Sequence, residues 1–148
     1  MCGRFVLSNF TDVKDFHNVL IEPSYNIAPS HCTLILNQEM SPDFLEWGYS
    51  PMWAKKPMNL INAKYESLDI KPSFKDYETC VFVADGWFEW QKNSRGEKHP
   101  IFIHASNEIF YFAGIKNASG AAIVTIDAHP SLANIPVSYT HLTLPTTS

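Results

Sequence analysis

The sequence lacks the features that mark membrane, secreted and zinc-binding proteins. No apolar run is long enough to cross a bilayer, so we expect no membrane partner. The start has no basic segment followed by an apolar one, so we expect no signal peptide. The cysteines, Cys2, Cys32 and Cys80, are odd in number and widely spaced, which argues against a disulfide framework or a zinc site. We therefore predict a cytoplasmic protein without a metal or other cofactor.

Positive charge is also scarce. Lysine and arginine together number 11 against 15 acidic residues, which gives a formal net charge of -4. This balance disfavours a nucleic-acid partner, because contacts to phosphate dominate non-specific binding. The charge is uneven, however, since Arg4, Lys55, Lys56 and Lys64 lie close to polar motifs. A local basic face on an acidic protein therefore remains open.

Hydrophobic residues make up 45% of the 148 residues and aromatic residues 14%, which predicts one packed domain. A helix is predicted over Asp12–Leu20, and Asp69–Tyr77 is expected to be a short helix or a connecting loop. Tyr25–Ser30 is expected to be irregular. Strands are predicted over Gly3–Leu7, Thr33–Asn37, Phe44–Gly48, Cys80–Val83, Trp87–Gln91, Ile101–His104, Ile109–Gly114 and Ala121–Ile126.

These elements predict an α+β fold, with a single strand-rich domain, a mixed and curled barrel-like sheet and a few short helices. From Pro136 onward the sequence is biased toward Thr, Ser, Leu and Pro and loses the alternation of turns and strands. We therefore assign residues 1–135 to the domain. Residues 136–148 are interpreted as a foreign-looking tail outside the fold.

Cys2 has unusual chemistry if Met1 is removed, which is common before a small residue. Its α-amine and thiol then form a 1,2-aminothiol. Such a group condenses with an aldehyde to an imine, and the thiol closes a thiazolidine ring. An unperturbed α-amine has a pKa of about 7.7–8.0 and an unperturbed thiol about 8.5, so both have a reactive fraction near neutrality. Position alone does not distinguish this role from an incidental early cysteine.

Glu89 lies within an aromatic segment. Alternation predicts that Trp87, Glu89 and Gln91 face one way and that Phe88 and Trp90 face the other. A carboxylate among aromatic side chains suits proton transfer, because burial disfavours its charged form. The alternative is a glutamate at a sheet edge that reaches water.

A second polar row consists of Asn62, Lys64 and Glu66, which share one face of an extended segment. This row either lines a pocket or forms a solvated face. The loop Gly48–Pro57 places Met52 and Trp53 beside two lysines. Composition favours insertion of both large side chains into the core, and the alternative is a stacking surface flanked by cations that bind phosphate.

Four stretches together resemble one family, the SRAP proteins, which are SOS-response-associated and process abasic sites. The stretches are Met1–Phe5, Tyr25–Pro29, Ile61–Glu66 and Ala84–Trp90. The resemblance implies covalent capture of abasic sites in single-stranded DNA, through a thiazolidine at Cys2, which protects the lesion during the DNA damage response. It implies an enzyme with crosslinking and lyase-like chemistry. The alternatives are a thiol autopeptidase, that is a hydrolase that removes Met1, and a non-catalytic module for single-stranded DNA.

The resemblance also assigns roles to residues. Cys2 is the nucleophile, Asn62 orients it, and Glu89 moves protons. The implied DNA contacts are Arg4, Asn26, Pro29, Met52, Trp53 and Lys64, where Lys64 replaces the usual arginine of the family and weakens bidentate phosphate recognition. The histidine of the family falls on Pro136, and His141 has no matching surroundings, so we expect a truncated copy of the domain. We expect a monomer that associates with the nucleoid when it binds DNA.

Overall fold

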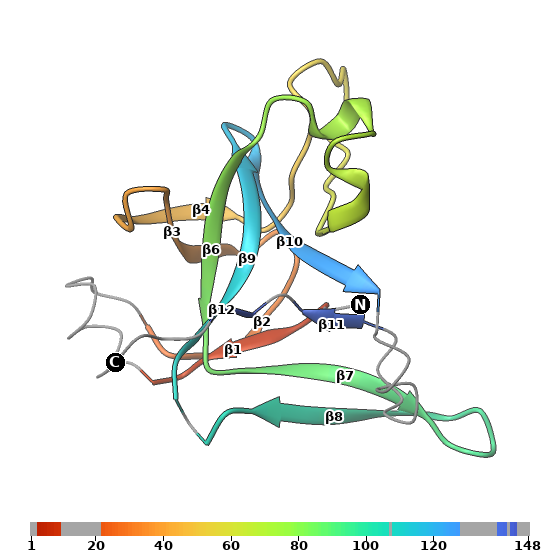
Figure 1. Ribbon diagram of the computed structural model, residues 1–148. Coiled ribbons are helices and arrows are strands. Elements are labelled where there is room, and N and C mark those ends of the chain that lie inside the picture. The colour runs from red at the N-terminus through yellow and green to blue at the C-terminus, as the bar shows by residue number, and fades with distance from the viewer. Residues whose placement is uncertain (1–2, 10–21, 107, 128–138, 142, 145–148) are drawn as a thin grey trace.

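The computed structural model describes residues 3–9, 22–106, 108–127, 139–141 and 143–144 (Figure 1). The helical elements of this part are two short 3-10 helices, η1 (Tyr65–Ser67) and η2 (Pro72–Phe74). The strands are β1 (Phe5–Leu7), β2 (Ser24–Ile27), β3 (Cys32–Leu36), β4 (Pro42–Glu46), β5 (Asn62–Lys64), β6 (Glu78–Ala84), β7 (Gly86–Lys92), β8 (Lys98–His104), β9 (Phe110–Asn117), β10 (Gly120–Asp127), β11 (Tyr139–His141) and β12 (Thr143–Leu144).

The strands form two sheets. The first has the order β2-β1-β7-β8, and each of its neighbouring pairs is antiparallel. The second has the order β11-β10-β9-β6-β3-β4, with β12 beside β9 and β5 beside β10. The pairing of β5 with β10 is parallel. The short strand β1 therefore lies at the centre of the first sheet, next to β7.

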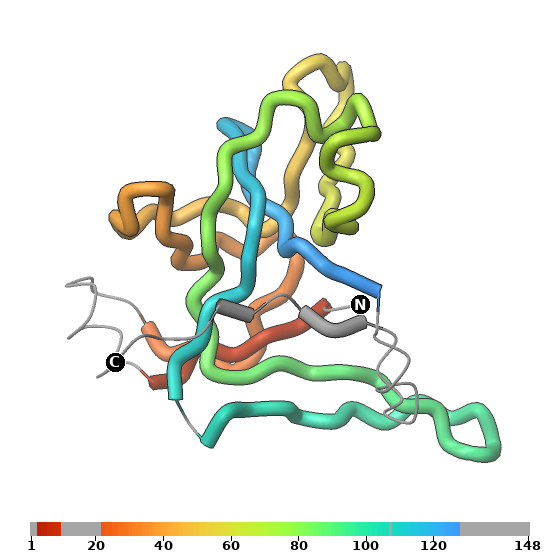
Figure 2. The backbone as a smooth tube through the Cα atoms, viewed as in Figure 1, coloured from red at the N-terminus to blue at the C-terminus, as the bar shows by residue number. Residues whose placement is uncertain are grey.

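Figure 2 shows the chain turning between β6 and β7, where it passes from the second sheet to the first. Asp85 is the residue between these two strands. Asp85 is 4% exposed. Its carboxylate accepts hydrogen bonds from the Ser8 amide at 2.7 Å, the Ser8 hydroxyl at 3.1 Å and the Asn9 amide at 2.5 Å. Its own amide donates to the Val6 carbonyl at 2.8 Å. A buried charge requires such partners, and here they fix the end of β1 to the corner between the sheets.

The main core forms around Phe5, which is fully buried. Its ring makes edge-to-face contacts with Trp47 at a centroid distance of 5.1 Å, and with Phe82 and Phe112 at 6.2 Å. Edge-to-face contacts between buried aromatic rings stabilise a core beyond the effect of the area they bury. The side chain of Phe5 therefore holds β1, and with it the first sheet, against the second sheet. A smaller core lies beside it and contains Tyr49, Ala63, Leu68, Phe74, Ile115, Ala122 and Val124.

The prediction of an α+β fold with a barrel-like sheet is wrong. Of the described residues, 54% are in strands and 5% are helical, no helix reaches seven residues, and neither sheet closes into a barrel. The segment Asp69–Tyr77, expected to be a short helix or a connecting loop, contains the three-residue η2, which begins at Pro72. The corner at Asp85 divides the strands between two sheets, so a single curled sheet does not form. The predicted helix Asp12–Leu20 lies outside the described residues.

Most strand predictions are confirmed within a few residues at each end. One prediction is wrong, because Tyr25–Ser30 is not irregular throughout. Its first residues belong to β2, where Ile27 pairs with Phe5. Pairing with β1 stabilises these residues as a strand, although their own sequence does not predict one.

The division into a domain of residues 1–135 and a tail of residues 136–148 stays a prediction, because the boundary lies outside the described residues. Within the predicted tail, the backbone of β11 pairs with β10 and that of β12 pairs with β9. The described part of the chain contains no helix with the length and apolar character needed to span a membrane.

The corner at Asp85 generates a prediction about stability. The substitution Asp85→Asn removes the charge that three donors share, so we expect unfolding free energy to fall by about 1–3 kcal/mol. Urea denaturation followed by tryptophan fluorescence measures this change. The control is Asp69→Asn, which changes an exposed aspartate and should leave the midpoint unchanged. Equal midpoints for both variants would contradict the role given to Asp85.

Candidate functional site

Glu89 lies in the middle of β7 and is 6% exposed. On the same face of β7, the ring of Trp87 packs against Phe110 at 5.5 Å and Phe112 at 5.7 Å. On the opposite face, Phe88 contacts Phe102 at 5.1 Å. Glu89 therefore shares the face of Trp87, as alternation along the strand predicted, and its low exposure shows that the rest of the fold covers this face. The alternative of a glutamate that reaches water at a sheet edge is wrong.

The start of the chain runs beside this strand. β1 pairs with β7 through Phe5 and Trp87, and the Phe88 amide donates to the Arg4 carbonyl at 3.0 Å. The same register, continued toward the N-terminus, sets Gly3 opposite Glu89. Cys2 itself lies outside the described residues. The residue that follows Cys2 thus lies two positions before β1, the strand that pairs with the one carrying the buried glutamate.

Asn62 lies on a strand of the second sheet that is connected to β1 through Trp47. It begins β5 and is partly buried, and it pairs with Ile123 of β10. The indole N–H of Trp47 donates to the Ile61 carbonyl at 2.9 Å, and the ring of Trp47 packs against Phe5. One tryptophan therefore links the entry to β5 with β1. Through this link, the strand that begins at Asn62 is connected to β1.

The predicted polar row is shorter than expected. Asn62 and Lys64 share one face of β5, because Ala63 between them is buried in the smaller core. Glu66 does not continue the row, since β5 ends at Lys64 and η1 begins at Tyr65. The interpretation of three aligned polar side chains is therefore wrong for Glu66.

The two basic residues of the predicted site have different surroundings. Arg4 is partly buried and its guanidinium donates to the Gly3 carbonyl at 2.8 Å. The ammonium of Lys64 lies 3.0 Å from the Asp127 carboxylate, with the two side chains 49% and 68% exposed. Exposed ion pairs contribute typically 0–1 kcal/mol, so a phosphate can compete with Asp127 for Lys64.

The residues from the second motif lie on the β2 side of β1. Asn26 is exposed on β2, and Pro29 follows in a turn and is partly buried. The turn is tied to the core, because the Ser30 amide donates to the Trp47 carbonyl at 2.9 Å. Trp47 therefore contacts two of the predicted motifs through its ring and its indole N–H, and its backbone contacts Ser30, the residue that follows a third.

Met52 and Trp53 project into solvent and are 66% and 62% exposed. The indole N–H of Trp53 donates to the Pro72 carbonyl at 3.3 Å, which anchors the loop without burying it. The composition-based interpretation that both side chains enter the core is wrong. Trp47 and Tyr49, earlier in the same segment, already occupy the two cores. The loop thus presents two large side chains beside exposed lysines.

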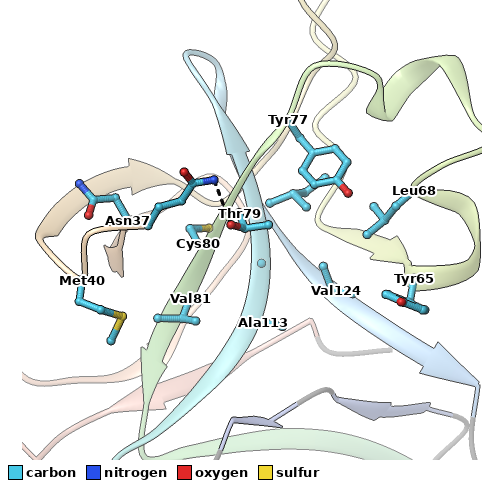
Figure 3. A pocket seen from close by; sticks show the side chains of 13 residues that line it. Asn37, Met40, Tyr65, Leu68, Tyr77, Thr79, Cys80, Val81, Ala113 and Val124 are labelled. Atoms are coloured by element: carbon cyan, nitrogen blue, oxygen red, sulfur yellow. Dashed lines mark hydrogen bonds between the residues drawn. The ribbon is translucent and has the colours of Figure 1, made fainter.

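A cavity of about 360 Å³ lies elsewhere, on the second sheet (Figure 3). Its lining is mainly apolar and includes Leu68, Val81 and Val124 but no residue of the predicted site. It also includes Cys80, whose pKa burial raises to about 12 although nearby Lys116 acts in the opposite direction. This thiol therefore stays protonated at neutral pH and does not compete as a nucleophile. Within the described ranges, no three His, Cys, Asp or Glu side chains gather as a metal site.

Comparison with protein families gives a match over nearly the whole chain. The model of the family described as "SOS response associated peptidase (SRAP)" matches residues 1–137. Abasic site processing protein YoqW of Bacillus subtilis is 36% identical over 133 residues, which cover 78% of this chain and 59% of YoqW. Abasic site processing protein YedK of Escherichia coli is 32% identical, with 91% of this chain and 72% of YedK covered. The chain thus spans about three fifths of the length of YoqW.

Solved structures share the fold. A phage-related protein from Bordetella bronchiseptica is 26% identical, with a TM-score of 0.73 and coverage of 97% of this chain and 78% of that one. A protein from Bacteroides thetaiotaomicron has a TM-score of 0.69 at 22% identity, covering 94% of this chain and 69% of that one. The second likeness concerns the fold alone.

The two described cysteines should differ in reactivity. Cys32 is exposed and Cys80 is buried with a pKa of about 12. In a Cys2→Ser variant at about pH 8, we expect iodoacetamide to alkylate Cys32 in the native protein and Cys80 only after denaturation. Peptide mass mapping distinguishes the two sites. Similar alkylation rates for both thiols in the native protein would contradict the burial of Cys80.

Proposed function

The chain belongs to the SOS response associated peptidase (SRAP) family, and on that premise we propose that it captures abasic sites in single-stranded DNA through the amine and thiol of Cys2. Relatives named abasic site processing proteins support the lesion as the target. Because the match covers 59% of YoqW, the capture of abasic sites by this chain is a proposal and is not carried over from YoqW. The proposal retains the sequence-based expectations of a monomer that acts in the cytoplasm.

The observation that supports this chemistry best is the pairing of β1 with β7. It sets the backbone around Gly3 beside the strand that carries Glu89, and Glu89 is buried. A carboxylate in such a place can take up and return protons close to a reacting amine. It also stabilises a positive charge that forms nearby, because the interior screens charge poorly.

The proposed reaction joins the protein and the sugar with loss of one water. An abasic sugar opens to an aldehyde, and the Cys2 amine adds to the aldehyde carbon. Proton transfers, assigned to Glu89, release water and leave an iminium ion. The Cys2 thiolate then adds to the same carbon, and the iminium nitrogen becomes the neutral ring nitrogen of a thiazolidine. No oxidant or reductant is required, and the reverse steps release the aldehyde.

The role of Asn62 is to orient the aminothiol and the sugar. Its strand is connected to β1 through the hydrogen bond from Trp47 to Ile61 and the contact of Trp47 with Phe5. An amide side chain is suited to this task, because it has two donors and an acceptor in a fixed plane. Asn62 would therefore act by positioning rather than by proton transfer.

The DNA strand is proposed to run past the remaining predicted residues. Arg4 and Lys64 supply positive charge for phosphates, and Lys64 is displaced from Asp127 at little cost. The exposed Met52 and Trp53 offer apolar surface on which bases stack. Asn26 and Pro29 lie on the β2 side of β1 and are assigned to the edge of the groove. Single-stranded DNA suits this arrangement, since its bases are free to stack.

Incubation with a single-stranded oligonucleotide that carries one abasic site tests the proposal. On a denaturing gel, we expect a shifted band with the wild-type protein and none with Cys2→Ala. Glu89→Gln should slow formation of the band by roughly 10²–10⁴-fold, which is typical for loss of one acid–base group. Because Pro136 replaces the histidine of the family, the wild-type rate should itself be low. The matched control is Cys32→Ala, which removes an exposed thiol and should crosslink like the wild type.

Two outcomes would contradict the proposal. A band that persists in Cys2→Ala would assign the link to another residue. Binding to intact and abasic DNA with equal affinity, and no band that survives denaturation, would leave only a non-catalytic single-strand binding module. If the intact mass shows Met1 in the Cys2→Ala variant but not in the wild type, the result would instead support the autopeptidase alternative.

A further inference from the structure

The β7–β8 hairpin has one face with an unusual composition. Its register pairs Phe88 with Phe102, Trp90 with Pro100 and Lys92 with Lys98, and pairs Gly86 with His104. Side chains directly opposite each other on antiparallel strands point to the same side. We call this side the outer hairpin face, and its side chains are Phe88, Trp90, Lys92, Lys98, Pro100, Phe102 and His104.

The rings on this face are in contact with each other and open to solvent. Phe88 and Phe102 lie 5.1 Å apart, and Phe102 and His104 stack at 5.3 Å with an interplanar angle of 24°. Phe102 is 44% exposed, as is Trp90. The ring of Phe102 covers Gly86 so closely that a Cβ atom there would lie 2.4 Å from it. The face is therefore an ordered aromatic surface rather than a set of scattered side chains.

Lys92 and Lys98 lie directly opposite each other at the far end of this surface. Like charges in this position destabilise a strand pair. Both lysines are exposed, and neither forms an ion pair with another described residue. Of the acids in the hairpin, Glu89 faces the other way, and the Glu97 carboxylate accepts a hydrogen bond from Asn93 at 2.7 Å. An anionic partner would relieve the repulsion between the lysines.

We propose that the outer hairpin face binds single-stranded DNA, with bases stacked on Phe102 and its neighbours and phosphates at Lys92 and Lys98. Stacking rings beside cations are the combination that single-strand binding proteins use. Although the formal net charge of the chain is -4, neither lysine of this pair forms an ion pair with a carboxylate of the described residues, so both ammonium groups are available to phosphate. A second copy of the chain suits the face less well, because a two-fold contact brings its lysines against those of the partner.

This inference rests on the proposed function, which supplies single-stranded DNA as the partner. It extends that function to a second surface, because the outer hairpin face is opposite to the face that carries Glu89. Figure 1 shows β7 and β8 side by side along the lower edge of the molecule, with their connection projecting past the other strands. β8 is an edge strand of its sheet. The hairpin can therefore hold DNA beyond the lesion, which increases affinity without contributing to the chemical step.

Fluorescence anisotropy with a labelled oligothymidylate of about 15 nucleotides and no abasic site tests the inference. In Lys92→Ala/Lys98→Ala, we expect weaker binding and a slope of log K against log salt that is smaller by about 1.4, since each phosphate contact contributes about 0.7. Lys92→Arg/Lys98→Arg keeps both charges and should bind like the wild type. Phe102→Leu keeps apolar cover over Gly86 and should weaken binding about five-fold or more through lost stacking.

The lesion-free probe separates this inference from the proposed function, because a chain that never crosslinks can still bind it. Unchanged affinity and salt slope in the double alanine variant, with a wild-type urea midpoint, would overturn the inference. A concentration-dependent dimer in sedimentation that Phe102→Leu abolishes, with DNA binding unchanged, would assign the face to a second copy and also overturn it. The lysine variants keep the test decisive if Phe102→Leu does not fold.

Discussion

The burial of Phe5 is the constraint on which the rest of the structure depends. Its ring packs edge-to-face against Trp47, Phe82 and Phe112, so the chain start is held between the two sheets. Its backbone pairs with β7, and Trp47 connects it to the entry of β5. Phe5 thereby connects β1 with the strand that carries Glu89 and, through Trp47, with the strand that carries Asn62. This packing holds Phe5 in place only three residues after Cys2, which we propose as the nucleophile.

The side chains of β7 alternate between two faces, and we propose a separate role for each face. The inner face carries Trp87 and the buried Glu89, close to the start of the chain. The outer face carries rings and lysines in solvent. The corner at Asp85 makes this division possible, because it turns the chain from the second sheet into the first and leaves β7 covered on one side only. Chemistry and strand binding can therefore be assigned to opposite sides of a single strand.

The sequence predicted much of this arrangement, and its errors have physical causes. Apolar runs and turn residues located the strands, and alternation placed Glu89 on the same face as Trp87. Composition misplaced Met52 and Trp53, since it does not reveal that Trp47 and Tyr49 already fill the cores. The role of Asp85 was missed, although a charged residue between an apolar run and Gly86 was a visible signal. The sequence did not predict that Lys92 and Lys98 lie opposite each other, because their pairing depends on the register of the hairpin, which only the structure shows.

The central claim is that the N-terminal aminothiol captures the aldehyde. Its most direct test is tryptic mass mapping of the product formed with abasic single-stranded DNA, after the DNA has been digested to the attached sugar. The account predicts that the peptide Cys2-Gly3-Arg4 carries the sugar with loss of one water, and that the adduct survives without chemical reduction. A sugar found on Lys64 or another lysine, and recovered only after borohydride reduction, would contradict it.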